Sequence, residues 1–220
     1  MNKYQALLKK AQDLHGEFCP GIVLGTRMCM IAMEQLEMNT NKNNENLVVY
    51  VEIDRCLPDA IQAVTGCSLG NRRLKYSDYG KFIATFVDIS SGKAVRVSAL
   101  DDKLNSSQGF WTWLENIMIS TKPGNLTPEK EEIEFAAQLM EEIALEDLLL
   151  MEEIHFEVPE NDIPGFIEHV AVCSVCGEHV MDWKEFTVNG KTICKSCTQK
   201  QVEILVNEVY SDGTDYEVKS

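Results

Sequence analysis

The sequence lacks any run of 18 apolar residues, the length at which a segment becomes a candidate transmembrane helix. The opening residues 1–14 also lack the apolar stretch and the cleavage site of a secretory signal, because lysines and an aspartate interrupt them. Both absences predict a cytoplasmic protein that has no membrane partner.

Positive charge is scarce. The chain has 20 Lys and Arg against 35 Asp and Glu, which gives a formal net charge of -15 and an isoelectric point near 4.7. A surface of this sign repels phosphate backbones, so nucleic acid is not an expected partner. Regulation of transcription is therefore the weakest functional hypothesis.

Internal repeats and low-complexity segments are absent, and so are the P-loop, G-x-G-x-x-G and G-x-S-x-G motifs. The hydrophobic fraction of 45%, the charged fraction of 25% and the mean hydropathy of -0.16 are ordinary for globular proteins. The composition therefore predicts a folded protein with a real core and excludes a disordered or fibrous chain.

Cysteine, by contrast, is plentiful. Four of the eight cysteines, namely Cys173, Cys176, Cys194 and Cys197, form a C-x2-C-x17-C-x2-C pattern. This spacing supplies four thiolates to one tetrahedral ion, which predicts a closed, structural Zn2+ site. With four thiolates present, His169 and His179 are surplus as ligands. Reduced thiols fit an intracellular compartment better than a secreted disulfide framework does.

Turn residues delimit this cysteine module. Asn189-Gly190 separates two short β-prone runs and predicts a hairpin that delivers the second cysteine pair, as in a zinc ribbon. Pro159, Pro164 and Gly165 precede the module. We therefore expect an α+β domain at residues 1–165, a four-cysteine zinc ribbon at 166–205 and a C-terminal tail at 206–220.

Hydrophobic periodicity, helix start and stop signals, and β-branched runs between turn residues predict helices and strands in the first domain. The helix that follows Pro20 is apolar on nearly every side, so we expect it to be central and buried. The predicted helices cover residues 3–14, 21–38, 58–65, 110–119 and 127–150, and the predicted strands cover 47–54, 81–89, 94–98 and 154–158. The predicted fold class is α+β, with an antiparallel sheet packed with helices and followed by a small zinc-ribbon domain.

The remaining four cysteines fall into two groups. Cys29 lies inside the apolar helix and is expected to be core. Cys19, Cys56 and Cys67 each fall at the end of a predicted element, where a scaffold can aim side chains into a common cleft. His15 precedes Cys19 by four residues at a helix N-terminus, where the helix dipole favours a thiolate. A shared metal or redox site is one hypothesis, and scattered buried cysteines are the other.

Three segments carry a family resemblance. HGEFCPG at residues 15–21, DRCLPDAIQ at 54–62 with TGCSLG at 65–70, and DYGK at 78–81 resemble, in the same order, motifs of the FmdE family of formylmethanofuran dehydrogenase proteins. The resemblance implies an α+β core, frequent dimers and a C-terminal zinc ribbon. It also favours a metal or thiol site made by His15, Cys19, Cys56 and Cys67.

Some residues at this site differ from the family pattern or add to the cluster. Glu17 stands where the family has a second histidine, and its harder carboxylate oxygen would change the metal preference or act as a base. Lys81 is a candidate for holding an anionic group of a substrate. Asp59 and Gln62 share a helix face near Cys56 and are candidates for hydrogen-bonding and orienting the ligands of a bound ion. The candidate catalytic residues are Cys19, Cys56, Cys67 and Lys81, and the candidate ligands of a second metal ion of unassigned identity are His15, Glu17, Cys19 and Cys56.

Two functional hypotheses follow. In the first, the chain is an enzyme or accessory protein of redox or one-carbon metabolism, with a Cys/His cleft site, a structural zinc and a redox-enzyme partner subunit. In the second, it is a non-catalytic zinc-binding module for protein interaction or regulation. We also expect a homodimer, from the resemblance and from the apolar segment at residues 110–114.

Overall fold

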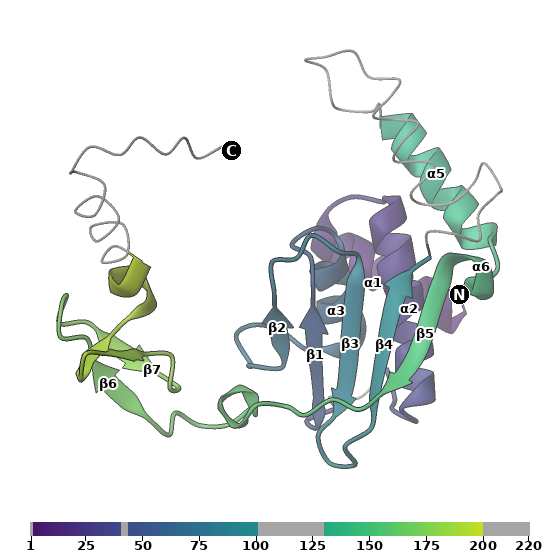
Figure 1. Cartoon of the computed structure of the whole chain (residues 1–220). Coiled ribbons are helices and arrows are strands. Elements are labelled where there is room, and N and C mark those ends of the chain that lie inside the picture. The colour runs from purple at the N-terminus through teal and green to yellow at the C-terminus, as the bar shows by residue number, and fades with distance from the viewer. Residues whose placement is uncertain (1, 41–43, 101–129, 200–220) are drawn as a thin grey trace, which may run out of the picture. The chain divides into compact units, whose positions relative to one another are not determined.

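The computed structural model describes residues 2–40, 44–100 and 130–199 (Figure 1). The chain divides after Pro164 into two compact units, residues 1–164 and 165–220. No helix within the described ranges is long and apolar enough to cross a membrane.

The first unit is a five-stranded sheet with helices packed against one face (Figure 1). Its strands run in the order β2-β1-β3-β4-β5. They comprise β1 (Leu47–Val51), β2 (Leu74–Tyr76), β3 (Ile83–Asp88), β4 (Ala94–Ala99) and β5 (Leu149–Ile154). The helices are α1 (Lys3–His15), α2 (Pro20–Gln35), α3 (Leu57–Thr65), α5 (Lys130–Glu142) and the short α6 (Leu145–Leu148), and the 3-10 turn η1 (Glu160–Asp162) follows β5.

The α2 helix is the centre of this unit. Its side chains are buried on nearly all sides, as the sequence predicts, and it contacts α1, α3, α5 and β4. Even a polar side chain inside it is satisfied, because the Thr26 hydroxyl donates to the carbonyl oxygen of Ile22 at 2.8 Å. Apolar residues from alternate positions of the strands complete the core on the helical face of the sheet.

Two parts of the sheet differ from the sequence prediction. The β2 strand was not expected, and it pairs with β1 in parallel, whereas the other three neighbouring pairs are antiparallel. The helix predicted to reach residue 150 ends at Glu142, and the next strand is Leu149–Ile154 rather than 154–158. This strand lies at the edge of the sheet and exposes four consecutive residues, so it has no alternating pattern that would reveal it. The predicted helix at 110–119 and the apolar segment at 110–114 lie outside the described residues.

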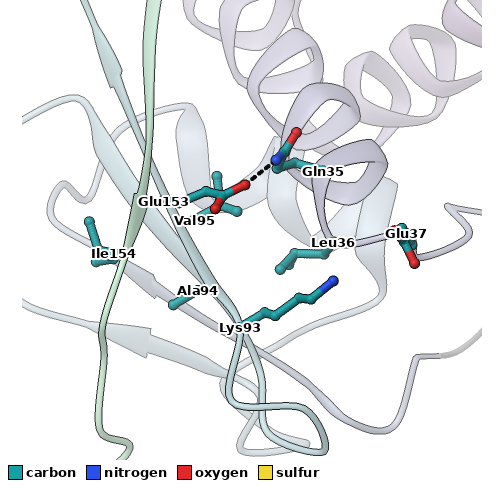
Figure 2. Close-up of a pocket in the computed structure, with 8 residues that line it drawn as sticks. All are labelled: Gln35, Leu36, Glu37, Lys93, Ala94, Val95, Glu153 and Ile154. Carbon is teal, nitrogen blue, oxygen red and sulfur yellow. Dashed lines mark hydrogen bonds between the residues drawn. The ribbon is translucent and has the colours of Figure 1, made fainter.

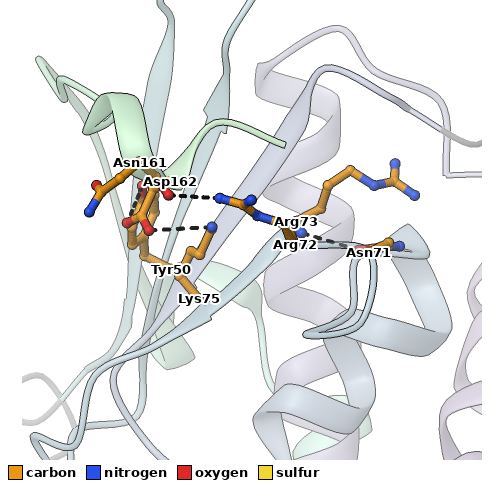
Figure 3. A network of polar contacts seen from close by, with 7 residues as sticks. All are labelled: Tyr50, Asn71, Arg72, Arg73, Lys75, Asn161 and Asp162. Atoms are coloured by element: carbon orange, nitrogen blue, oxygen red, sulfur yellow. Dashed lines mark hydrogen bonds and ion pairs between the residues drawn. The ribbon is translucent and has the colours of Figure 1, made fainter. Parts of the chain in front are cut away.

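The segment after β5 is fastened to the other end of the sheet (Figure 3). The Tyr50 hydroxyl donates to Asp162 at 3.3 Å, and the Lys75 ammonium lies 3.4 Å from the other carboxylate oxygen of Asp162. Arg72 donates to the carbonyl oxygen of Asn161 at 2.8 Å. These contacts hold the chain on β1 and β2 up to the point at which the first unit ends.

A pocket lies at the opposite edge of the sheet, between the end of α2 and the strands β4 and β5 (Figure 2). The Gln35 amide donates to the carboxylate of Glu153 across it. Lys93 and Glu37 also line it. The pocket contains none of the residues that the sequence analysis selected as candidate site residues.

The second unit contains two small hairpins, β6 (Val170–Val172) with β7 (His179–Met181) and β8 (Phe186–Val188) with β9 (Lys191–Ile193). Asn189 and Gly190 both have positive φ, at 51° and 74°, as a two-residue type I′ turn requires. The hairpin predicted from this dipeptide is therefore confirmed.

The α2 and α3 helices approach each other closely at Gly25. A Cβ atom built on Gly25 would lie 2.7 Å from the Cβ of Ala60 and 3.2 Å from Cδ1 of Leu57. Because the Cβ of Ala60 is attached directly to the α3 backbone, it cannot rotate away. The contact therefore requires a glycine on α2.

We predict that Gly25→Ala lowers the free energy of unfolding by about 1–3 kcal/mol, because the added methyl group overpacks this contact. The direction of this change is informative. Alanine in a helix is otherwise more favourable than glycine, so a loss of stability would come from the close contact with α3. Chemical denaturation followed by circular dichroism measures the change. Gly70→Ala is the matched control, because a Cβ at Gly70 meets nothing within 4 Å. Equal stability of the two variants would contradict the prediction.

Candidate metal centres

His15, Cys19 and Cys56 form a cluster in the first unit. His15 is the last residue of α1, and Cys19 and Cys56 are the N-cap residues of α2 and α3. One ligand atom from each residue lies within 4.8 Å of those of the other two. The two Sγ atoms are 3.5 Å apart and hydrogen-bonded. Three helix ends thus bring one imidazole and two thiols to one point.

Local sequence explains why these helices end and begin here. Gly16 adopts the left-handed conformation with φ at 90° and caps α1, while Pro20 occupies the first turn of α2. His15 and Cys19 therefore flank a tight turn between two helices.

Gly21 makes room for Cys56. A Cβ atom at Gly21 would lie 2.9 Å from both the Cβ and the Sγ of Cys56, and 3.7 Å from the ring of Phe82. Neither Gly21 nor Phe82 is among the site residues predicted from the sequence. The position of Gly21 directly after Cys19-Pro20 could have indicated its role, because glycine permits the close approach of a neighbouring side chain.

The pKa values of the two thiols are shifted in opposite directions. The hydrogen bond with Cys56 lowers the pKa of Cys19 to about 6, and the amides of Ile22 and Gly21 and the charge of His15 act in the same direction against the effect of burial. The hydrogen bond with Cys19 and burial raise the pKa of Cys56 above its ordinary value. The pair therefore favours one thiolate, on Cys19, at the N-terminus of α2.

Asp59 orients His15. Its Oδ2 lies 2.8 Å from Nδ1 of His15, and Nε2 of Gln62 donates to the other oxygen at 3.4 Å. Burial lowers the pKa of His15. The hydrogen bond to Asp59 and the charge of Cys19 together raise this pKa by more than burial lowers it, so the net shift is upward. An aspartate on one ring nitrogen leaves the other for a metal ion, which is the usual arrangement around ligating histidines.

The other predicted site residues, Glu17, Cys67 and Lys81, are not part of the group formed by His15, Cys19 and Cys56. Cys67 is buried and points its thiol at the carbonyl oxygen of Leu47, at 3.5 Å. The side chains of Glu17 and Lys81 are exposed, and the Lys81 amide donates to the carbonyl oxygen of Glu52. Cys29 is fully buried in α2, as expected of a core thiol. The structure thus brings together three of the candidates and separates Cys67 from them.

The second cluster is made by Cys173, Cys176, Cys194 and Cys197, whose sulfur atoms lie within 4.8 Å of one another. The amide of Cys194, in the second C-x2-C pair, donates to Sγ of Cys173 in the first pair at 3.3 Å. The surplus histidines have other surroundings. His169 contacts Glu185 at 2.7 Å and stacks on Trp183, and His179 is an exposed residue of β7. This cluster has the ligand set and the hairpins of a zinc ribbon.

Comparison with known proteins identifies the family of this chain. The family model described as "FmdE, Molybdenum formylmethanofuran dehydrogenase operon" matches residues 14–153. The chain belongs to the FmdE family. The matched range contains His15, Cys19 and Cys56, whereas the four-cysteine cluster lies beyond it.

Two relatives add detail. A protein of Archaeoglobus fulgidus described as a probable S-adenosyl-L-methionine-binding protein is 41% identical over 99 residues, a match that spans 44% of this chain and only 27% of that relative. The crystal structure of a tungsten formylmethanofuran dehydrogenase FmdE-like protein from Syntrophus aciditrophicus superposes with a TM-score of 0.56. It is 23% identical, and the match covers 90% of this chain and 92% of that one, so it supports the fold.

We predict that Asp59→Asn weakens metal binding at the His15 cluster by about 10- to 100-fold, because the amide no longer fixes the imidazole as the carboxylate does. Competition with a chromophoric chelator measures the affinity. Asp13→Asn is the matched control, since it removes a nearby exposed negative charge on α1 that pairs with Lys9 instead. Similar affinities for the two variants would mean that Asp59 acts only through its charge.

Proposed function

We propose that this FmdE protein binds a functional metal ion through His15, Cys19 and Cys56, and that it serves redox or one-carbon metabolism as an enzyme or an accessory subunit. We further propose that the second unit holds a structural Zn2+. The observation that carries the first proposal is the convergence of three ligand atoms within 4.8 Å from three separate helix ends.

The number and type of ligands support a functional rather than a structural role. Zn2+ sites with three protein ligands keep a coordination position open, whereas structural sites use four. The imidazole and the two sulfurs suit zinc and similar transition metals better than magnesium or calcium. A bound ion of this kind would act as a Lewis acid toward a substrate oxygen.

The surrounding residues hold the ligands in place. Asp59 fixes the imidazole ring, Gly21 gives Cys56 its space, and the first amides of α2 favour a thiolate on Cys19. Cys19 is buried, and His15 and Cys56 are partly buried, which excludes part of the surrounding water and strengthens electrostatic interactions there.

The reducing cytoplasm is the compartment that we propose, because all eight cysteines are free thiols and ligand cysteines must stay reduced. A redox-enzyme partner and a homodimer belong to the same proposal. The homodimer is tested by light scattering of the whole chain across micromolar concentrations, where a monomeric mass would count against it.

The alternative function is a non-catalytic zinc-binding module for protein interaction or regulation. The observation that favours it is the exposed apolar surface of the second unit, where Trp183, Met181 and Val172 are each about half exposed. In that case the first unit would hold no metal ion.

We predict two metal ions per chain in protein purified without oxygen, one for each cluster. Cys56→Ser should reduce the content to one, because it removes a ligand from a site that has three. Cys29→Ser is the matched control and should keep both ions, since Cys29 lies outside both clusters. Elemental analysis alongside protein quantification measures the ratio. One ion per chain in wild type and in Cys56→Ser alike would favour the alternative function.

We also predict that Cys176→Ser loses the other ion and makes the chain beyond residue 165 sensitive to proteases. Among the described residues of the second unit, those 165–199, the buried core is made by Cys173, Ile193 and Cys197, so we expect the metal ion to contribute most of what holds this part together. Limited proteolysis followed by mass spectrometry locates the cuts. Full metal retention and unchanged proteolysis would contradict the structural role.

A further inference from the structure

Cys19 and Cys56 are close enough to form a disulfide bond. Their Sγ atoms are 3.5 Å apart, so they are about 1.5 Å from the S–S bonding distance. Cys56 is only partly buried, which gives reagents in solution a route to the pair. Pairing is therefore favoured by both distance and access.

The other two cysteines of the first unit differ in both respects. Cys29 and Cys67 are fully buried, and the thiol of Cys67 points to the carbonyl oxygen of Leu47. Neither belongs to the group formed with His15. They provide internal controls within the same unit.

The fold holds the pair together. The N-termini of α2 and α3 meet where Gly21 has no Cβ, and a methyl group there would collide with both the Cβ and the Sγ of Cys56. The helices that carry the sulfurs belong to the main hydrophobic core. The short distance between the sulfurs is thus a property of packed helices rather than of loops.

We infer that Cys19 and Cys56 form a redox-active dithiol that reduces small disulfides and, on closing to a disulfide, releases the metal ion held by the same site. The second half of this inference rests on the proposed function, because it requires that the ion be bound there. The first half concerns the two thiols alone.

The reaction is a thiol–disulfide exchange in two steps. One cysteine sulfur attacks the disulfide R–S–S–R, the S–S bond breaks, and one R–SH leaves after taking up a proton. The second cysteine sulfur then attacks the mixed disulfide and displaces the other R–SH. The protein loses two electrons and two protons, the disulfide gains both, and the new Cys19–Cys56 bond no longer offers two thiolates to a metal ion.

The test uses the full chain carrying Cys67→Ser, stripped of metal with a chelator and treated with hydroxyethyl disulfide. Trypsin cuts after Lys10, Arg27, Arg55 and Arg72, so Cys19 lies on peptide 11–27 and Cys56 on peptide 56–72. The serine at position 67 leaves one cysteine on the second peptide. Without reduction, the two peptides should appear joined, with two hydrogen atoms fewer than their sum.

Single replacements test whether the two thiols act together. In Cys19→Ser and in Cys56→Ser, the joined peptides should be lost and the remaining cysteine should retain half of the reagent as a mixed disulfide. Cys29→Ser, in contrast, should give the same yield of joined peptides as the parent. If Cys19 and Cys56 remain free thiols, or both keep the reagent without joining, the dithiol inference is overturned.

The metal-loaded protein separates this inference from the proposed function. We expect one ion to leave at the rate at which peptides 11–27 and 56–72 become joined. If the peptides join while the ion stays bound, the inference of metal release is overturned but the inference of a redox-active dithiol is supported. If the first unit binds no ion at all and the peptides still join after chelation, the proposed function fails and the dithiol stands.

Discussion

The close contact between α2 and α3 is the constraint on which the rest of the first unit depends. Gly21 and Gly25 lie on one face of α2, four residues apart, and they meet Cys56 and Ala60, which have the same spacing on α3. A side chain larger than hydrogen at either glycine would collide with α3. The packing of small residues therefore sets the distance between the helices and, at its N-terminal end, the distance between the two sulfurs.

This origin explains why the cluster is well defined although its residues lie at the ends of helices. Cys19 and Cys56 begin helices whose remaining turns are buried in the core, and His15 ends a third helix that packs on both. Asp59 then fixes the imidazole from within the first turn of α3. Core packing thus positions the three side chains that we propose as metal ligands.

Much of this arrangement could be predicted from the sequence. Apolar periodicity predicted α1, the apolar run after Pro20 predicted α2, and the segment from Pro58 to the stop at Gly66 predicted α3. The positions of Cys19 and Cys56 at element ends indicated a shared site. The sequence could not predict the orientation of Cys67. A position at the end of an element fixes where the residue lies but not where its side chain points, and this thiol points to the Leu47 carbonyl oxygen.

The β2 and β5 strands could not be predicted for another reason. Their pairing with β1 and β4 joins distant segments, and the exposed acidic residues Glu152 and Glu153 in β5 continue the pattern of the preceding helix.

The two cysteine clusters differ mainly in what holds their surroundings together. Among the described residues of the second unit, two of the three in the buried core are cysteines of the cluster itself, so loss of the Zn2+ that we propose there would disturb most of that core. In the first unit, a large apolar core exists apart from the ligands. We therefore expect the fold to persist when the ion that we propose at His15, Cys19 and Cys56 is exchanged or when these cysteines are oxidised. In our proposal, the same thiol chemistry is structural in the second unit and available for reaction in the first, because only the second unit would depend on its cysteine cluster to fold.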